Sequence, residues 1–455
     1  MPTLNAPVVG PVRVADRRRG RFLLVNADTG AWGVTNRAGL LSLPKPEAPS
    51  AVAALRDQLL AGEQATTAPG RDALLYVIYK LTDTCNFRCV YCYDRKFARR
   101  KDTARRDASI RAVLDQALAS GIGRIHLLFH GGEPLEEISE MRALVAQYGP
   151  LGPDRIQFSV QTNGSLLDAD IVGFFNQNLV GLSVSLDGTT AAANALRMVG
   201  GRPDPYTQLN QRIDEIDGLA RDRLGLVLTV GRHNAALLAD SLVGIERDGF
   251  RSASLSFMQQ VGPGAQGAST RELVTALLAV VARIVEGELS ELAVWTLIEW
   301  VRQLTERRTE LTCLTSPCGA GRTVITVLPS GEIGPCDSIF DPRYYTPDLP
   351  TYLAQLAAPQ SRLGALAGRE RHATEPCRSC DVAPHCNGTC PGNAILQSGH
   401  PETPADDECA FHYAWIIELM WVLSDPVRGP GLLDYCAMHR QRRTALRTAM
   451  TAQLA

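Results

Sequence analysis

Three cysteines in the first quarter of the chain have the spacing of an iron-sulfur site. Cys85, Cys89 and Cys92 are separated by three and by two residues. One short loop with this spacing can place three thiolates around a single cluster, which leaves one iron without a protein ligand. Zinc is the alternative metal, but a zinc ion usually takes a fourth Cys or His close by, and this loop has none. The loop therefore predicts a cluster with an open iron where a small molecule can bind.

The loop resembles that of the radical S-adenosylmethionine (SAM) enzymes, which hold a four-iron four-sulfur cluster with CxxxCxxC spacing. In that family the open iron binds the methionine end of SAM. Three further motifs are similar to those of the family and follow apolar runs in the same order: Gly131-Gly132-Glu133-Pro134, Gln161-Thr162-Asn163-Gly164 and Ser185-Leu186-Asp187-Gly188. The resemblance implies that the three cysteines of the loop are cluster ligands.

The position of these motifs has a physical reason of its own. A parallel barrel gathers the C-terminal ends of its strands on one face, so motifs far apart in sequence meet there. Glycines let the backbone approach a cofactor closely, and Glu133 offers a carboxylate that suits a ligand ammonium group. The resemblance also implies that Tyr91 lies against the adenine. The expected SAM pocket contains Tyr91, Gly131, Gly132, Glu133, Pro134, Asn163, Ser185, Asp187 and Arg197.

The segment around Arg197 departs from the pattern of the relatives. Many of them have His-Asp-x-x-Arg here, whereas this chain reads Ala193-Asn194-Ala195-Leu196-Arg197. The glycine-rich segment that usually follows is replaced by Gly200-Gly201-Arg202-Pro203. This departure disfavours one branch of the family, the sulfatase-maturing enzymes, and leaves the radical chemistry untouched.

Six apolar, β-branched runs alternate with stretches of helical period. They predict buried strands at residues 74–81, 124–129, 156–160, 179–186, 224–230 and 253–258. Six strand-helix units are too few to close a barrel of eight, and the family resemblance implies a partial (β/α)6 TIM-like barrel. The open side of such a barrel would admit a peptide.

A second group of cysteines lies in the C-terminal third of the chain. Cys377, Cys380, Cys386 and Cys390 are spaced CxxCxxxxxCxxxC, and by spacing alone these four could share one zinc ion. The region as a whole resembles the SPASM extension of radical enzymes, whose complete members hold two auxiliary four-iron four-sulfur clusters. Its remaining cysteines are Cys313, Cys318, Cys336 and Cys409.

The resemblance implies a set of four ligands for each auxiliary cluster. The first set is Cys313, Cys318, Cys336 and Cys390. The second set is Cys377, Cys380, Cys386 and Cys409. Neither cluster would keep an open iron, which favours electron transfer over substrate binding. Together with the cluster at Cys85, Cys89 and Cys92, the two auxiliary clusters bring the expected cofactors to SAM and three four-iron four-sulfur clusters.

One carboxylate is a candidate for proton transfer. Asp337 directly follows Cys336, at the position where sulfatase-maturing relatives carry an aspartate proposed as a general base. The alternative is that Asp337 only hydrogen-bonds the loop beside a cluster.

The first 70 residues stand apart from the barrel. Phe22 to Asn26 and Trp32 to Thr35 predict two short strands around a turn at Ala27 to Gly30, and Ser50 to Leu60 predicts a helix. The stretch from Arg21 to Leu43 resembles the start of a PqqD-like peptide-recognition domain, a small winged-helix α+β unit that takes a leader peptide as an added strand. The alternative is an appendage that only packs on the barrel.

Bulk properties limit the other functions. The formal net charge of -2 gives no footprint for nucleic acid. No apolar stretch is long enough for a signal peptide or a membrane span, so we expect a cytoplasmic protein with cysteines free for metal. Cys436 is left over and is expected to be a half-buried thiol. The predicted domains are 1–70 N-terminal extension, 71–261 barrel, 262–310 helical linker, 311–412 SPASM domain and 413–455 C-terminal helices.

Three functions agree with this sequence. The first is a radical SAM maturase that oxidises a ribosomally made precursor peptide, forming a carbon-carbon or thioether crosslink after a 5'-deoxyadenosyl radical abstracts hydrogen. The second is an anaerobic sulfatase-maturing enzyme that converts Cys or Ser to formylglycine. The third is a peptide-binding or electron-carrying protein that no longer cleaves the cofactor. The two enzymes would need an electron donor such as flavodoxin or ferredoxin.

Overall fold

The structure is a computed structural model that describes residues 7–60, 74–94, 100–197, 204–258, 266–371 and 375–452. Its chain divides into two compact units, each built from three stretches. The first unit is Met1–Ala68, Glu299–Cys318 and Arg369–Asp434. The second unit is Pro69–Ile298, Gly319–Gly368 and Tyr435–Ala455.

A nine-stranded sheet organises the second unit over the described residues. Its order is β11-β10-β9-β8-β7-β6-β5-β12-β13, and every neighbouring pair is parallel except β12 with β13. The six predicted strands are confirmed as β5 (Leu74–Lys80), β6 (Arg124–His130), β7 (Ile156–Thr162), β8 (Gly181–Leu186), β9 (Gly225–Val230) and β10 (Ser252–Phe257). Three short strands extend the sheet beyond them: β11 (Ala293–Val294), β12 (Val324–Val327) and β13 (Ile333–Gly334).

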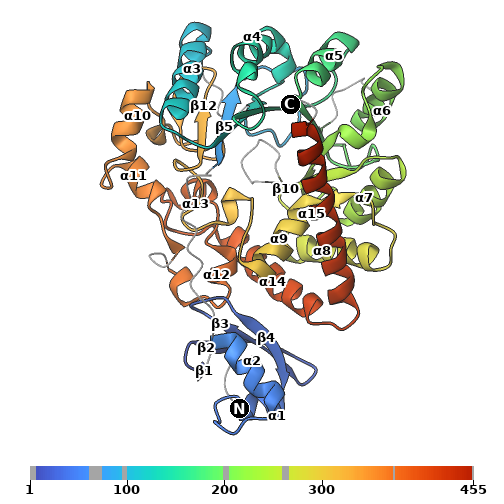
Figure 1. The fold of residues 1–455 in the computed structure, drawn as a ribbon, viewed down its shortest axis with the longest axis vertical. Coiled ribbons are helices and arrows are strands. Elements are labelled where there is room, and N and C mark those ends of the chain that lie inside the picture. The colour runs from blue at the N-terminus through green and yellow to red at the C-terminus, as the bar shows by residue number, and fades with distance from the viewer. Residues whose placement is uncertain are drawn as a thin grey trace. The chain divides into compact units, whose positions relative to one another are not determined.

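Helices between the strands cover the outside of this sheet, as Figure 1 shows. They bury the apolar side of each amphipathic pattern against strand residues such as Val77, Leu127 and Val160, which have no exposed surface. The covering helices are α3 (Thr103–Ala119), α4 (Ile138–Tyr148), α5 (Ala169–Gln177), α6 (Pro205–Glu215), α7 (Leu238–Arg247) and α8 (Thr270–Val285). Two more helices of this unit are α10 (Leu349–Leu356) and α11 (Arg362–Ala367). The open, mainly parallel sheet agrees with the predicted partial barrel.

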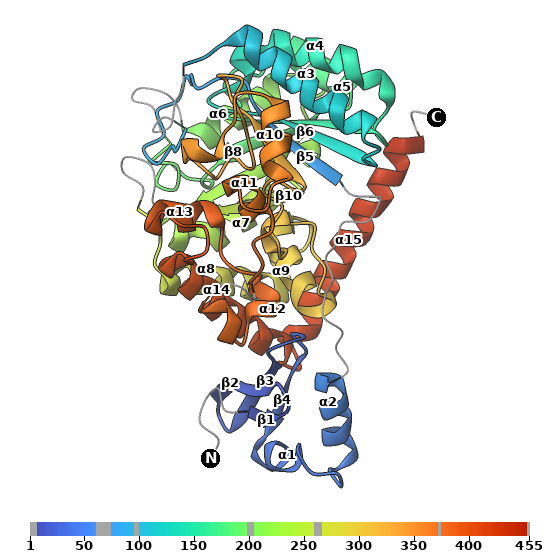
Figure 2. The ribbon, with the colours of Figure 1, turned by 90° about the vertical axis from the view of Figure 1, so that its left-hand side faces the viewer.

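The first unit begins with a four-stranded antiparallel sheet, visible beside α2 in Figure 2. The predicted hairpin is present as β3 (Arg21–Asn26) and β4 (Trp32–Asn36), and the predicted helix as α2 (Ser50–Leu60). The sequence analysis did not predict β1 (Pro7–Val9), β2 (Val12–Arg18) and α1 (Arg37–Ser42). A small apolar core joins the sheet to both helices: Val12, Val14, Phe22, Leu24, Leu40, Leu43 and Leu59.

The turn between β3 and β4 packs against the cysteine-rich part of the same unit. Gly30 has a left-handed φ of 76°, and a Cβ there would lie 2.7 Å from the Cβ of Pro384. The Nε2 atom of His385 lies 2.7 Å from the Gly30 carbonyl oxygen, and Arg307 donates a hydrogen bond to the Thr29 carbonyl at 2.6 Å. The tip of the hairpin is therefore fixed to α12 (Ala383–Cys386).

The remaining helices are α9 (Trp295–Glu306), α13 (Pro391–Ser398), α14 (Asp406–Leu423) and α15 (Arg428–Ala452). No helix in the described ranges is long and apolar enough to cross a membrane. Cys436, expected to be half-buried, is buried with 5% of its surface exposed. The first residues of the predicted linker, 262–265, and the altered segment at 200–203 lie outside the described residues.

Candidate active site

The cysteine loop is held by two glycines at the end of β6. The N–H groups of Gly132 and Glu133 donate to the carbonyls of Thr82 and Thr84 at 2.7 and 2.8 Å. A Cβ on Gly132 would lie 1.8 Å from the Thr84 carbonyl oxygen, so no other residue fits without moving the backbone. This close approach fixes the chain just before Cys85.

The side chain of Glu133 joins its own motif to the motif at the end of β7 instead of pointing to solvent. Its side chain has no exposed surface, and its carboxylate accepts from Leu135 N at 3.1 Å, Thr162 Oγ1 at 2.6 Å and Asn163 N at 2.9 Å. Burial raises the pKa of this carboxyl, and the hydrogen bonds oppose that shift. In this structure the carboxylate expected for a ligand ammonium is bound to protein groups. Pro134 follows as the first residue of the short 3-10 helix η1 (Pro134–Glu137).

Asn163 links the end of β7 to the cysteine loop. Its Nδ2 lies 3.8 Å from Cys85 Sγ and donates to Asn86 Oδ1 at 2.8 Å. Burial raises the pKa of Cys85 to about 11, so its thiol is protonated at neutral pH until a metal displaces the proton. Ser185, at the end of β8, accepts a hydrogen bond from Gln161 at 3.3 Å.

The buried carboxylate of Asp187 contacts two other residues of the expected pocket, Tyr91 and Arg197. Both of its oxygens lie 2.8 Å from the Tyr91 hydroxyl, and Arg197 Nε donates to it at 3.2 Å. The guanidinium carbon of Arg197 lies 5.7 Å from the centroid of the Tyr91 ring. Burial would lower the pKa of Arg197, but the charges of Tyr91 and Asp187 hold it well above its ordinary value. Arg197 also reaches the cysteine loop, because its carbonyl lies 3.9 Å from Cys89 Sγ.

Sequence reasoning missed three residues around Asp187. His233, just after β9, stacks on Tyr91 with ring centroids 6.4 Å apart and has Nε2 3.7 Å from Asp187 Oδ2. Neither ring nitrogen of His233 has a hydrogen-bond partner among the described residues. Asn194 accepts from the Asp187 N–H at 2.9 Å, and Asn234 donates to its carbonyl at 2.8 Å. The available signal for His233 and Asn234 was their position three and four residues beyond β9, whereas Asn194 lies eight residues beyond β8.

Asp337 lies in a second polar cluster of the same unit. The sequence predicted Asp337 and Cys336 as site residues but not Tyr93, Lys80 or Asp94. The Tyr93 hydroxyl donates to Asp337 Oδ2 at 3.4 Å, and Cys336 Sγ lies 3.5 Å from Asp337 Oδ1. Lys80 makes a buried ion pair with Asp94, and its ammonium lies 5.0 Å from the centroid of the Tyr93 ring. Burial raises the pKa of Tyr93 well above its ordinary value, and nearby charges on Asp94 and Asp337 add to that effect. Tyr93 therefore stays protonated and available as a donor to Asp337.

A small cavity adjoins this cluster. It has a volume of about 20 Å³, which is room for a water molecule. Its lining residues are Lys80, Asp83, Asp94, Leu328, Pro329, Phe340 and Tyr345.

The thiols of the first unit fall into two groups, according to which of them raise one another's pKa. Burial raises the pKa of Cys380 to about 11, and the charges of Cys377 and Cys409 add to it. Burial also raises the pKa of Cys386 well above its ordinary value, with further contributions from Cys377 and Cys380. These four thiols make up one group.

Cys390 belongs to the other group. Burial raises its pKa well above the ordinary value, and the charges that add to this shift are those of Glu408, Cys313 and Cys318. Its backbone N–H donates to Glu408 Oε1 at 3.1 Å. The remaining predicted ligand of this set, Cys336, belongs to the second unit.

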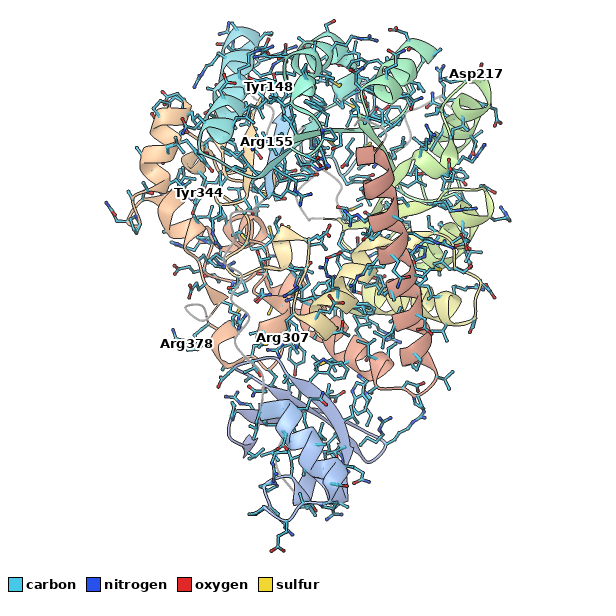
Figure 3. All side chains as sticks on the ribbon, in the orientation of Figure 1. Tyr148, Arg155, Asp217, Arg307, Tyr344 and Arg378 are labelled. Carbon is cyan, nitrogen blue, oxygen red and sulfur yellow. The ribbon has the colours of Figure 1, made fainter. Side chains whose placement is uncertain are left out.

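The donor chemistry of these sites suits iron-sulfur clusters. Each group offers thiols, which iron-sulfur clusters take as ligands. Cys377 and Cys386 are buried, whereas Cys313 is exposed. Cationic groups lie near the second set, since the charges of Arg369 and Arg371 lower the pKa of Cys377 against the effect of its burial. Figure 3 shows the side chains of both units, with Arg307 and Arg378 labelled in the first.

Comparison with known proteins identifies the domain that carries the loop. Residues 79–226 match the sequence model of the Radical SAM superfamily. An uncharacterized protein of Archaeoglobus fulgidus is 23% identical over 328 residues, 70% of this chain and 74% of that protein. The cysteine-type anaerobic sulfatase-maturating enzyme of Clostridium perfringens is 26% identical over 132 residues, which are 27% of this chain and 35% of the enzyme.

Two solved structures have a similar fold. The structure of anSMEcpe with bound AdoMet has a TM-score of 0.60 at 16% identity and covers 76% of this chain and 99% of its own. The structure of Streptococcus suis SuiB bound to precursor peptide SuiA has a TM-score of 0.55 at 16% identity, covering 85% and 96%. At these identities the likeness concerns the fold.

Replacing Gly132 with alanine tests whether the close approach at β6 positions the cysteine loop. We expect Gly132→Ala to lower the iron content of the purified chain, because the new Cβ displaces the Thr84 carbonyl and with it Cys85. Gly173→Ala is the matched control, since nothing lies within 4 Å of a Cβ there. Iron is measured per folded chain after anaerobic reconstitution. Equal iron in both variants would contradict the positioning role.

Proposed function

We propose that this chain, a radical SAM enzyme by its domain at residues 79–226, is a maturase that oxidises a ribosomally made precursor peptide. The product would carry a carbon-carbon or thioether crosslink between side chains. The grouping of thiols in the first unit is the observation that carries this proposal, because it provides for auxiliary clusters in addition to the one at the cysteine loop. Auxiliary clusters suit a reaction that must remove a second electron from the substrate.

The grouping favours two auxiliary clusters over one zinc ion. A zinc ribbon would bring Cys390 to Cys377, Cys380 and Cys386, whereas the charges that raise the pKa of Cys390 are those of Glu408 and, among the thiols, Cys313 and Cys318. Within the second set, the charge of Cys377 raises the pKa values of Cys380, Cys386 and Cys409. The assignment of Cys336 to the first set rests on the sequence resemblance.

Each part of the second unit has a role in this proposal. Cys85, Cys89 and Cys92 would hold the first cluster, and the Asp187 group with Tyr91 and Arg197 would form a wall of the SAM pocket. When bound, the cluster and SAM would supply the chemistry that abstracts a hydrogen atom from the peptide, with the electron for it coming from an external donor such as flavodoxin or ferredoxin. Asp337 would then accept the proton that the oxidised substrate loses, with Tyr93 holding its carboxylate by a hydrogen bond. Such clusters persist in a reducing compartment, which supports the cytoplasm as the location.

A peptide is the substrate class that the fold neighbours support. SuiB has been solved with precursor peptide SuiA, and anSMEcpe with the Cp18Cys peptide. For the first 60 residues we propose the binding of a leader segment. The edge strand β4 is followed by α1, whose Leu41 is 55% exposed. A peptide added beside β4 could cover this side chain.

Sulfatase maturation is the second candidate function. Asp337 beside Cys336 favours it, as does the similarity to the cysteine-type anaerobic sulfatase-maturating enzyme. The N-terminal sheet and the absence of the His-Asp pair before Arg197 disfavour it.

Tandem mass spectrometry separates the two candidates. A precursor peptide encoded beside the gene would be co-expressed with the enzyme under anaerobic conditions. We expect the loss of two hydrogens and missing backbone fragments between two residues, because a side-chain crosslink holds those fragments together. An unmodified peptide, with an aldehyde formed instead on a sulfatase-type sequence, would establish the second candidate.

Asparagine at position 337 tests the proposed proton acceptor. We expect Asp337→Asn to lower product formation by about 100-fold or more, the usual effect of losing a general base, while 5'-deoxyadenosine still forms. Asp341→Asn is the matched control, because Asp341 caps a short helix and pairs with Arg343. Product and 5'-deoxyadenosine are quantified in the same reaction. Full turnover in Asp337→Asn would remove the residue from the mechanism.

An exposed leucine on α1 tests leader binding without deleting the sheet. Deletion of residues 1–70 would also remove the turn that contacts His385, so lost binding would be ambiguous. We expect Leu41→Asp to weaken binding of the full precursor by about tenfold, equivalent to about 1.4 kcal/mol. Leu353→Asp, at a leucine 40% exposed on α10, should have no effect. Calorimetry with the full and the leaderless peptide is the measurement, and equal affinities in both variants would refute leader binding at this surface.

A further inference from the structure

One histidine beside the second auxiliary site has no role in the proposal above. His412 Nδ1 lies 3.3 Å from Cys386 Sγ, within hydrogen-bond distance for sulfur. The two residues come from different helices, Cys386 from the end of α12 and His412 from α14. A contact across 26 residues between two helices does not follow from local chain geometry.

The ring of His412 is held in place from other sides. Trp300 meets it edge-on, with ring centroids 5.2 Å apart at 77°. Trp300 is itself 4% exposed, and the His412 side chain is 13% exposed. The imidazole therefore has little freedom to turn away from Cys386.

The helix that carries His412 also serves both auxiliary sites. Glu408, Cys409 and His412 occupy one turn of α14. Cys409 is a predicted ligand of the second auxiliary cluster. Glu408 accepts a hydrogen bond at 3.1 Å from the N–H of Cys390, which is a predicted ligand of the first auxiliary cluster. His412 Nε2 lies 3.9 Å from Glu408 Oε1, so this turn connects Cys386 to Cys390 through side chains.

We propose that His412 donates an Nδ1–H hydrogen bond to the Cys386 sulfur of the second auxiliary cluster and thereby raises the reduction potential of that cluster. The inference rests on the proposed function, because it needs a cluster on Cys377, Cys380, Cys386 and Cys409. A cysteine that ligates iron has no proton, so at this distance the proton between the two atoms must be on nitrogen. A donor to sulfur stabilises the extra negative charge of the reduced cluster, and hydrogen bonds to sulfur are among the known determinants of cluster potential.

The raised potential would affect how readily the cluster takes an electron from the substrate. A cluster with a raised potential accepts an electron more readily, so His412 makes the second auxiliary cluster a better acceptor. The cations Arg369 and Arg371 act on Cys377 in the same direction, and the carboxylate of Glu375 acts against them. His412 is thus a positioning and tuning residue, and it touches neither peptide nor SAM in this proposal.

Redox titration followed by electron paramagnetic resonance tests the proposal on the full-length, reconstituted protein. We expect His412→Leu to keep its iron and to shift the second cluster to a lower potential. His412→Asn should retain the wild-type potential, because an asparagine amide places an N–H near the position of Nδ1. His400→Leu, at an exposed histidine of the same unit, is the control and should cause no shift. An unchanged potential in His412→Leu would overturn the proposal.

A second measurement does not depend on a variant that folds. Wild-type protein labelled with ¹⁵N-histidine is reduced and examined by pulsed electron paramagnetic resonance. A weak nitrogen coupling to the second cluster supports a hydrogen bond, whereas no coupling, or the strong coupling of a direct ligand, refutes it. Wild-type protein that assembles only the cluster at Cys85, Cys89 and Cys92 would instead refute the proposed function, and the role of His412 with it.

Discussion

The close approach of β6 to the cysteine loop is the constraint on which the second unit depends. Gly132 has room for a hydrogen atom where any other residue would place a carbon 1.8 Å from the Thr84 carbonyl oxygen. Because the backbone runs this close, the next residue, Glu133, can be buried and reach the end of β7. Asn163 then returns from β7 to Cys85. One contact between backbones thus sets the position of a thiol, a carboxylate and an amide that come from three motifs.

Asp187 has the corresponding role on the other side of the loop. A buried carboxylate needs compensation for its lost hydration, and the Asp187 carboxylate receives this from Tyr91 and Arg197. Asn194 and Asn234 bond the backbone N–H and carbonyl of the same residue. Arg197 in turn places its carbonyl beside Cys89. The loop is therefore tied to β7 through Cys85 and to β8 through Cys89. Removing either tie would leave a buried polar group without its partner, which is costly in itself.

Sequence reasoning recovered the central strands because their signal is local. β5 and β9 are nearly continuous apolar runs, whereas β7 and β10 alternate apolar with polar residues. Neither pattern needs tertiary information to be recognised. β2 was missed because its alternation of Val12 and Val14 with charged residues is interrupted by an irregular register between Val14 and Asp16. The contacts of Tyr93 with Asp337 and of His412 with Cys386 join residues distant in sequence. No spacing rule identifies such pairs, since only the folded chain brings them together.

The N-terminal sheet is packed on its own unit at the hairpin tip, and leader binding at its edge is our proposal. Its hairpin tip is fixed to α12 through Gly30 and His385, directly beside Cys386. This contact is what a packing appendage would make, and it explains why Gly30 cannot carry a side chain. Leu41 takes no part in that contact, whereas Trp32 of β4 donates to the Leu304 carbonyl of α9 at 3.1 Å and accepts from Gln58 at 3.2 Å. The proposed leader site would therefore use Leu41 and the part of β4 beyond Trp32, and a fixed tip would limit the ordering cost of binding there.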